Sequence, residues 1–336
     1  MHLLVIRPGA IGDALLALPV IQALRLQRGY VQVRLVTNTA ILPLARASRL
    51  VDKTFDYGDP RWSELFSTSG IDGMGDMLEL INNVDTAICW LRDPDGLVER
   101  NLRAQGIPQV IVAPGRPAEN EHVHIVEHLA RTVGIDPPGP FVFGFSPPPP
   151  QGDRKGSPLL YSEPNAYPCI VGAIPCSRPA CGRPDGCGRP FPDAPIAIHP
   201  GSGGARKCWP IASFAAVIRA LWQRETPVLL LAGPADRERL ATLMSMIAQP
   251  PRPTLLKLLV DLPLLELAQH LQLCRGYLGN DSGITHLASM LGIPTLALFG
   301  PSDPLIWRPC GPRVQLIHQP DLEHLPVDEV MGTLEL

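Results

Sequence analysis

Residues 280–288, Asn-Asp-Ser-Gly-Ile-Thr-His-Leu-Ala, combine several features that suit binding of an anion. They follow a short apolar run and open a stretch with helical periodicity, so Asp281-Ser282-Gly283 is predicted to start a helix. The first N–H groups of a helix have no intrahelical partners, and with the positive helix end they bind phosphate. We expect Asp281 to cap this helix, Gly283 to let a ligand approach the backbone, and His286 to reach the same anion.

Comparable loops follow other apolar runs. One ends in Gly12-Asp13, another is a glycine-rich stretch from Pro200 that leads to Lys207, and a third begins Gly233-Pro234. Glycine-rich loops, a lysine and a helix start from one half of the chain would cradle a nucleoside diphosphate, with Asp13 of the other half facing them. The candidate phosphate-binding residues are Gly12, Ser202, Gly203, Lys207, Gly233, Pro234, Asp281, Ser282, Gly283 and His286.

The elements that must position these loops alternate between strand and helix, which is typical of parallel sheets covered on both faces. The predicted strands are 2–7, 31–37, 51–57, 86–91, 109–113, 196–199, 227–232, 254–260, 277–279, 295–299 and 314–318. The predicted helices are 14–27, 41–48, 73–82, 94–104, 121–133, 211–223, 237–248, 263–273 and 283–291. Pro19 must kink the first helix or end its first part. Because doubly wound sheets bind ligands beyond the carboxyl ends of their strands, the loops named above should meet in one cleft.

Length and composition support a globular protein of two domains. The 336 residues suffice for two cores, and 45% hydrophobic with 18% charged residues is ordinary for such a protein. A net charge of −3 and 5% aromatic residues do not indicate a protein that binds nucleic acid. No apolar run is long enough to span a bilayer, and the N-terminus lacks the features of a signal peptide, so we predict a cytoplasmic protein.

We predict an N-terminal Rossmann-like domain over 1–145 and a C-terminal one over 195–336, with a linker over 146–194. The linker is rich in Pro and Gly, which disfavours regular structure. It contains Cys169, Cys176, Cys181 and Cys187, whose spacing fits no common zinc motif. An irregular linker is the first interpretation, and a structural metal site is the alternative.

The combination of motifs resembles glycosyltransferase family 9, the lipopolysaccharide heptosyltransferases. The resemblance rests on His199-Pro-Gly-Ser-Gly203, Lys207-Cys-Trp-Pro210, Asn280-Asp-Ser-Gly283 with His286-Leu-Ala288, Phe299-Gly-Pro301, Arg7-Pro-Gly-Ala-Ile-Gly-Asp13 and Leu18-Pro19. It covers most of 1–145 and 195–330, whereas the linker departs from it. It implies the GT-B fold, in which two Rossmann-like domains with parallel sheets face a central cleft.

The resemblance also implies an inverting glycosyltransferase that needs neither metal nor cofactor. Asp13 would be the general base, Lys207 would contact the donor phosphates, and Asp281-Ser282-Gly283 would hold the pyrophosphate. The expected reaction moves heptose from ADP-heptose to a lipopolysaccharide core acceptor, a lipid-linked saccharide, with peripheral contact at the inner membrane. The alternatives are transfer from another nucleotide sugar to a cell-surface glycan, and a catalytically silent nucleotide-sugar-binding protein.

Each assignment has a plainer competitor. Asp13 can be a helix cap, Lys207 a solvated lysine, and His199 a buried histidine with satisfied hydrogen bonds. His124-Ile-Val-Glu-His128 matches a zinc-hydrolase pattern, although no third ligand is evident. Asp93-Pro94-Asp95 matches a metal motif of another glycosyltransferase class, but the proline indicates a turn and a helix start.

Overall fold

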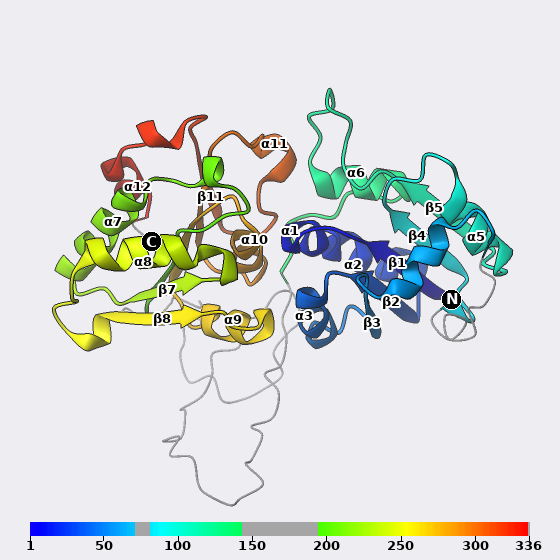
Figure 1. Cartoon of the computed structure of the whole chain (residues 1–336), viewed down its shortest axis with the longest axis horizontal. Helices are drawn as coiled ribbons and strands as arrows, with labels where there is room; N and C mark the ends of the chain where they lie inside the picture. The colour runs from blue at the N-terminus through cyan, green and yellow to red at the C-terminus, as the bar shows by residue number, and fades with distance from the viewer. Residues whose placement is uncertain (71–80, 143–193, 335–336) are drawn as a thin grey trace, which may run out of the picture.

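The computed structural model describes residues 1–70, 81–142 and 194–334, which form two α/β units in contact with each other (Figure 1). The predicted linker, with its four cysteines, lies outside the described residues except for residue 194. Most of the predicted helix 73–82 also lies outside them, in the gap between residues 70 and 81. Within the described ranges, no helix is both long and apolar enough to cross a bilayer.

The first unit is built on a five-stranded parallel sheet with the order β3-β2-β1-β4-β5. Its strands are β1 (His2–Arg7), β2 (Gln32–Thr37), β3 (Lys53–Asp56), β4 (Thr86–Trp90) and β5 (Gln109–Ala113). Its α-helices are α1 (Ile11–Leu15), α2 (Leu18–Arg28), α3 (Leu42–Ala47), α5 (Leu97–Ala104) and α6 (Ile125–Thr132). The central strand β1 pairs in register with β2 and β4, and its residues from Leu3 to Ile6 are fully buried. Continuous burial is expected for a strand covered on both faces.

The second unit holds a six-stranded parallel sheet with the order β11-β10-β9-β6-β7-β8. Its strands are β6 (Ile196–His199), β7 (Val228–Ala232), β8 (Leu256–Val260), β9 (Gly276–Asn280), β10 (Thr295–Phe299) and β11 (Val314–His318). Its α-helices are α7 (Ile211–Gln223), α8 (Arg237–Ile247), α9 (Leu264–Leu271), α10 (Gly283–Met290), α11 (Pro304–Trp307) and α12 (Val327–Thr333). The inner strands are buried throughout, which explains their unbroken apolar sequences.

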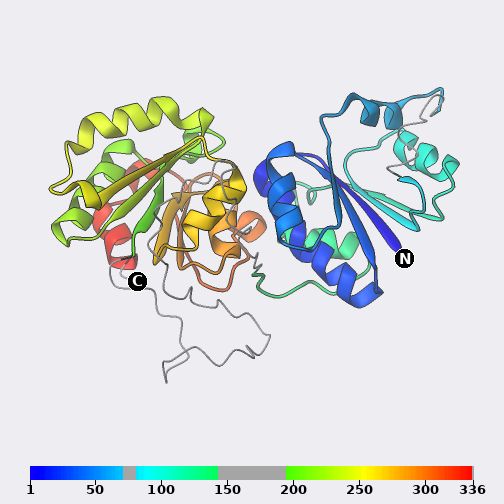
Figure 2. The same ribbon diagram turned by 90° about the horizontal axis from the view of Figure 1, so that it is seen from below.

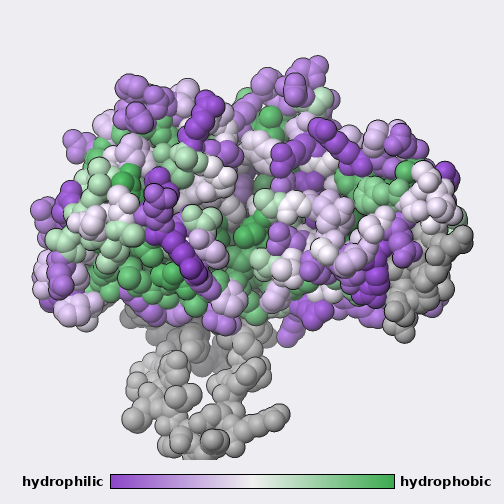
Figure 3. Space-filling model, in the orientation of Figure 1, coloured by the Kyte–Doolittle hydropathy of each residue, from purple (hydrophilic) through white to green (hydrophobic). Residues whose placement is uncertain are grey.

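The two units meet through helices at the carboxyl ends of their sheets. α1 packs against α10, and α3 packs against α9, as Figure 2 shows from below. One buried apolar cluster contains Leu15 of the first unit and Leu287 of the second. On the face shown in Figure 3, apolar residues gather at this junction as well as on the second unit, while polar residues are interspersed elsewhere.

The predicted elements agree with the structure apart from several boundaries and short helices. The first predicted helix is two helices, because Pro19 lies in the first turn of α2, where its missing N–H costs no hydrogen bond. α6 begins at Ile125 rather than at 121, since the His124 side chain accepts from Val126 N and caps the helix there. The prediction missed α11, α12 and the 3₁₀ helix η2 (Pro60–Phe66). A helix this short lacks the repeated turns that reveal periodicity.

Trp209 shows why the loop after β6 has a defined shape. Its side chain is fully buried, stacks edge-on against Phe214 at 5.1 Å, and donates Nε1–H to the Leu325 carbonyl at 3.0 Å. It therefore joins the loop to the core instead of facing a ligand.

We expect Trp209→Ala to destabilise the second unit by about 3–5 kcal/mol, because it removes a large buried ring and leaves a cavity. Trp209→Phe keeps a ring but loses the hydrogen bond, so it should cost less. Urea denaturation followed by circular dichroism measures both effects, and an alanine variant as stable as wild type would contradict this role.

Candidate active site

The start of α10 is formed as an anion-binding helix end, with one difference from the sequence prediction. Ser282, not Asp281, is the N-cap: its Oγ accepts from Thr285 N at 3.3 Å. The prediction that Asp281 caps the helix was wrong, because Asp281 lies one residue too early for its carboxylate to meet those N–H groups. Gly283 is the first helical residue, so its N–H has no intrahelical partner.

Asp281 instead forms an ion pair with Lys207. The Lys207 ammonium lies 2.8 Å from Asp281 Oδ2, and the Ser202 hydroxyl donates to the Asp281 carbonyl at 2.6 Å. Asp281 is 7% exposed whereas the Lys207 side chain is 41% exposed. Buried Asp281 therefore anchors a lysine that still reaches solvent. Three predicted site residues are brought together here by two loops 74 positions apart.

Asn280, which the sequence analysis did not list as a site residue, shapes the glycine-rich loop. Its amide donates to the carbonyl oxygens of Pro200 and Gly201 at 2.8 and 3.3 Å, and its Oδ1 accepts from Trp209 N at 3.0 Å. The residue is fully buried, so these bonds satisfy a side chain that water cannot reach. The sequence feature that could have identified Asn280 is a polar asparagine at the end of an otherwise apolar strand.

His199 connects two of the loops. Its Nε2 lies 3.0 Å from Asp236 Oδ2, and its Nδ1 lies 3.4 Å from Ser282 Oγ. Burial disfavours the Asp236 carboxylate, but the hydrogen bond and charge of His199, with Gly233 N–H, hold the pKa of Asp236 below its ordinary value. His199 is thus a buried histidine with satisfied hydrogen bonds, as the plainer interpretation proposed.

Three other predicted phosphate contacts lie in the loops after β6 and β7. Gly233 ends the β7 strand region, and its N–H already donates to Asp236 at 2.8 Å. Pro234 begins the short 3₁₀ helix η4 (Pro234–Asp236) next to it. Gly203 stands in open space, since a Cβ placed there would meet nothing within 4 Å. Contact of these three residues with a nucleotide stays a prediction.

Asp13 lies in the first unit, buried and surrounded by donors. Its Oδ1 accepts from Arg7 Nη2 at 3.2 Å, and its Oδ2 accepts from Ala10 N at 3.1 Å. Arg116 Nη2 lies 3.3 Å from Oδ1 and 3.1 Å from Oδ2. Asp13 is therefore the third residue of α1, and it hydrogen-bonds back to the N-cap residue Ala10 instead of being the N-cap itself. The sequence analysis singled out neither arginine as a site residue.

Gly9 makes room for this carboxylate. Its φ of +128° is unfavourable for other residues, and a Cβ there would come within 2.9 Å of Asp13 Oδ2. A side chain at position 9 would push Asp13 out of its place.

The two halves of the site touch where α1 meets α10. A Cβ on Gly12 would lie 3.3 Å from His286 Cδ2, and a Cβ on Gly283 would lie 2.8 Å from Ile11 Cγ2. Glycine at both positions thus lets the helix starts approach closely. His286 is 3% exposed, and its Nδ1 has no hydrogen-bond partner among the described residues. Gly12, Gly283 and His286, all predicted to surround the same anion, are in one place.

Burial lowers the pKa of His286 to about 4, although the charges of Asp281 and Asp13 oppose the shift. His124 and Lys207 add to it. The imidazole is therefore neutral at neutral pH. A neutral ring with an unpartnered nitrogen can donate or accept one hydrogen bond to a ligand.

The rival metal motifs have other roles in the structure. His124 Nε2 lies 2.9 Å from the Arg308 carbonyl, and His128 Nε2 lies 2.9 Å from the Pro114 carbonyl. Asp93 accepts from the N–H groups of Val98 and Glu99 at 3.1 Å and so starts α5. The part of the chain that the structure describes contains no cluster of three His, Cys, Asp or Glu side chains suited to a metal.

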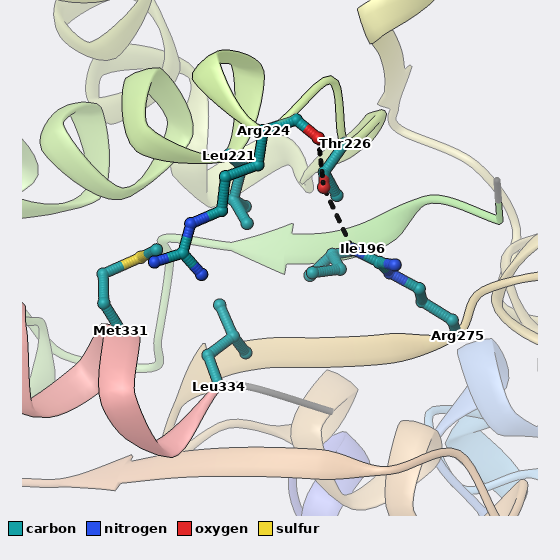
Figure 4. Close-up of a pocket in the computed structure, with 7 residues that line it drawn as sticks. All are labelled: Ile196, Leu221, Arg224, Thr226, Arg275, Met331 and Leu334. Carbon is teal, nitrogen blue, oxygen red and sulfur yellow. Dashed lines mark hydrogen bonds between the residues drawn. The ribbon is translucent and has the colours of Figure 1, made fainter. Parts of the chain in front are cut away.

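A cavity of about 280 Å³ lies at the other end of the second sheet (Figure 4). Ile196, Thr226 and Arg275, which line it, precede or begin strands, so it opens at the amino ends. Ligands of doubly wound sheets bind at the carboxyl ends. We therefore place the candidate active site at the junction of α1 and α10.

The chain is similar to known proteins in sequence and in fold. The family model described as glycosyltransferase family 9 (heptosyltransferase) matches residues 180–332, which include Lys207, Asp281 and His286. This part of the chain is therefore similar to glycosyltransferase family 9. It is 34% identical over 134 residues to lipopolysaccharide heptosyltransferase 3 of Escherichia coli, an alignment that spans 39% of the chain and 38% of that relative.

Solved structures extend the similarity in fold to the whole chain. E. coli ADP-heptose lipopolysaccharide heptosyltransferase II superimposes with a TM-score of 0.69 at 18% identity, covering 99% of this chain and 97% of that one. E. coli heptosyltransferase WaaC with ADP gives 0.66 at 18% identity, covering 100% and 99%. The two parallel sheets therefore have the GT-B arrangement that the sequence predicted.

The lowered pKa of His286 predicts a pH dependence of stability. The unfolded chain takes up a proton near the ordinary pKa of 6.5, whereas the folded protein does so only near 4. The contribution of His286 to the free energy of unfolding is therefore fully present above pH 6.5 and is lost as the pH falls towards 4. The loss should be about 2 kcal/mol between pH 7 and pH 5.

His286→Asn should reduce this part of the pH dependence, as measured by urea denaturation at several pH values. His324→Asn, at a side chain that is 72% exposed, is the matched control and should keep the wild-type slope. An unchanged slope in His286→Asn would show that His286 does not contribute.

Proposed function

We propose that this protein is an inverting glycosyltransferase whose active site is the junction of α1 and α10. The observation that carries the proposal is the contact between Gly12, next to Asp13, and the helix start at Gly283, next to Lys207 and His286. It brings a buried carboxylate of one domain to the anion-binding helix end of the other. Both components are needed for transfer from a nucleotide sugar.

The chemistry follows from these charges. The acceptor hydroxyl oxygen bonds to the anomeric carbon while the bond from that carbon to the diphosphate oxygen breaks. Asp13 takes the hydroxyl proton, and the diphosphate leaves with the electron pair. Lys207 and the free N–H groups at the start of α10 stabilise the developing negative charge, so no divalent metal is required for the step. Attack opposite the leaving group inverts the anomeric centre.

We propose ADP-heptose as donor and a lipopolysaccharide core precursor as acceptor. Two similar structures support the donor, since one is named an ADP-heptose transferase and the other contains ADP. The lipid-linked acceptor would place the protein at the cytoplasmic face of the inner membrane. Transfer from another nucleotide sugar to a cell-surface glycan is the alternative. A silent binding protein is disfavoured, because it would have no need of the general base Asp13.

The test combines binding with turnover. Thermal shift with ADP, UDP, GDP and their sugars identifies the nucleotide, since a ligand of the folded state raises the melting temperature. Transfer of heptose to lipopolysaccharide lacking its heptose residues is then measured with and without EDTA. We expect stabilisation by ADP compounds and EDTA-insensitive transfer. Stabilisation by UDP or GDP alone would reject the donor, and loss of transfer in EDTA would reject the metal-independent step.

Asp13→Asn keeps the side-chain shape but removes the base. Turnover should fall by roughly 10²–10⁴-fold, the usual contribution of a general base. Affinity for ADP, measured by calorimetry, should hardly change because Asp13 lies in the other domain. Since the variant leaves buried Arg7 without its anion, a circular dichroism spectrum must show that it is folded. Near-normal turnover would reduce Asp13 to a residue that only supports the start of α1.

Lys207→Ala should weaken binding of ADP by about ten- to a hundredfold, because a charge-assisted contact contributes about 1.5–3 kcal/mol. Loss of Lys207 also leaves the Asp281 carboxylate unpaired beside the diphosphate. Arg206→Ala, one residue earlier in the same turn, is the matched control and should bind normally. Equal affinity of the Lys207 variant and the control would show that the phosphate site lies elsewhere.

A further inference from the structure

Arg116 links the candidate base to the opposite domain. It follows β5 in the first unit, and its Nη2 contacts both carboxylate oxygens of Asp13. The same guanidinium also meets the second unit, where Arg116 Cζ lies over the ring of Trp307 in α11, 5.2 Å from its centre. A cation over an indole face is attracted by the ring electrons.

Counting the lone pairs of Asp13 shows what Arg116 does there. A carboxylate has about four acceptor positions. Oδ1 is bonded to Arg7 and Arg116, and Oδ2 to Ala10 N and Arg116. Three donor nitrogens therefore share the carboxylate, and Arg116 Nη2 is the one that contacts both oxygens. A base must turn one lone pair to the proton it accepts, so the donor that bridges both oxygens has to leave before the reaction.

Arg116 is the donor that can leave. Ala10 N is part of the backbone at the start of α1 and cannot move independently. The Arg7 side chain is 4% exposed, and it also bonds the carbonyl oxygens of Asp13 and Trp90. The Arg116 side chain is 65% exposed. Release of Arg116 frees the lone pairs of Asp13 that it contacts, while Arg7 and Ala10 keep the carboxylate oriented.

Contacts between the domains hold Trp307 next to this arginine. His122 Nδ1 lies 2.6 Å from Asp303 Oδ2, and His124 Nε2 donates to the Arg308 carbonyl at 2.9 Å. These two bonds flank α11 on either side of Trp307. Arg116 is thus held on Asp13 when the domains are together.

We propose that Arg116 gates the base: it covers the carboxylate oxygens of Asp13 until the acceptor displaces it. This inference rests on the proposed function. The gate would protect a bound donor from hydrolysis. In hydrolysis, water oxygen bonds to the anomeric carbon, the bond to the diphosphate oxygen breaks, and Asp13 takes the water proton. With Arg116 in place, Asp13 cannot accept that proton.

Hydrolysis of ADP-heptose without acceptor tests the gate, followed as release of ADP. Arg116→Ala should hydrolyse the donor at least about tenfold faster than wild type, the effect of removing a charge-assisted hydrogen bond. Arg116→Lys keeps the charge without the planar fork and should lie between the two. Adding Asp13→Asn to Arg116→Ala should abolish the gain, because the gain depends on the base.

Variants of Trp307 provide a second test of the gate. Trp307→Leu should raise hydrolysis by about two- to fivefold, the value of an exposed cation–π contact, and Trp307→Phe by less. Trp307→Leu should add nothing to Arg116→Ala, since both remove one interaction. The matched control is Arg131→Ala, a 60% exposed arginine paired with Glu127 in its own helix, and it should leave hydrolysis unchanged.

The direction of the change separates the gate from a supporting role. A slower or unchanged hydrolysis in Arg116→Ala would overturn the gate, because an arginine that only orients Asp13 must lower the rate when removed. Additive effects of the Arg116 and Trp307 substitutions would overturn the part assigned to Trp307. Wild-type protein that binds no ADP-heptose by thermal shift would overturn the proposed donor instead, and would be recognised before any variant is compared.

Discussion

The close approach of α1 and α10 is the constraint on which the candidate site depends. Each helix starts at the carboxyl edge of its own sheet, so neither sheet alone can bring the candidate base Asp13 and the start of α10 together. Gly12 and Gly283 lack the side-chain atoms that would separate the two starts. The apolar cluster behind them contains residues of both units and stabilises the contact by burying surface from water.

Around this contact, every buried acid of the site has a basic or donor partner. Asp13 faces Arg7 and Arg116, Asp281 faces Lys207, and Asp236 faces His199. An unpaired charge in such places would cost several kcal/mol, whereas a matched pair offsets most of the desolvation. In the pairs with Arg116 and Lys207 the acid is buried and the base is partly exposed. The mobile partner can therefore change position when a ligand arrives.

The similarity to known proteins and the geometry support different parts of the proposed function. The family model covers the second unit, with the lysine and the helix end, and the similar structures share the whole fold. The geometry adds what a motif does not contain: the donors around Asp13, the neutral state of His286 and the contact of Arg116 with Trp307.

The sequence by itself determined the two parallel sheets and the positions of their loops, because apolar runs, glycines and prolines act locally and leave a pattern in the chain. It also identified Asp13, Lys207, Ser202 and His286 as candidates, since glycine-rich turns and helix starts have recognisable residues. It assigned the cap of α10 to Asp281 when Ser282 has that role, because both residue types cap helices and a shift of one position is invisible in the sequence. Only the tertiary structure decided that Asp281 binds Lys207, that Asn280 fixes the loop, and that Arg7 and Arg116 surround Asp13. Arg116 and Asp13 are 103 residues apart, and such contacts depend on how two folded units pack, which no local pattern of residues encodes.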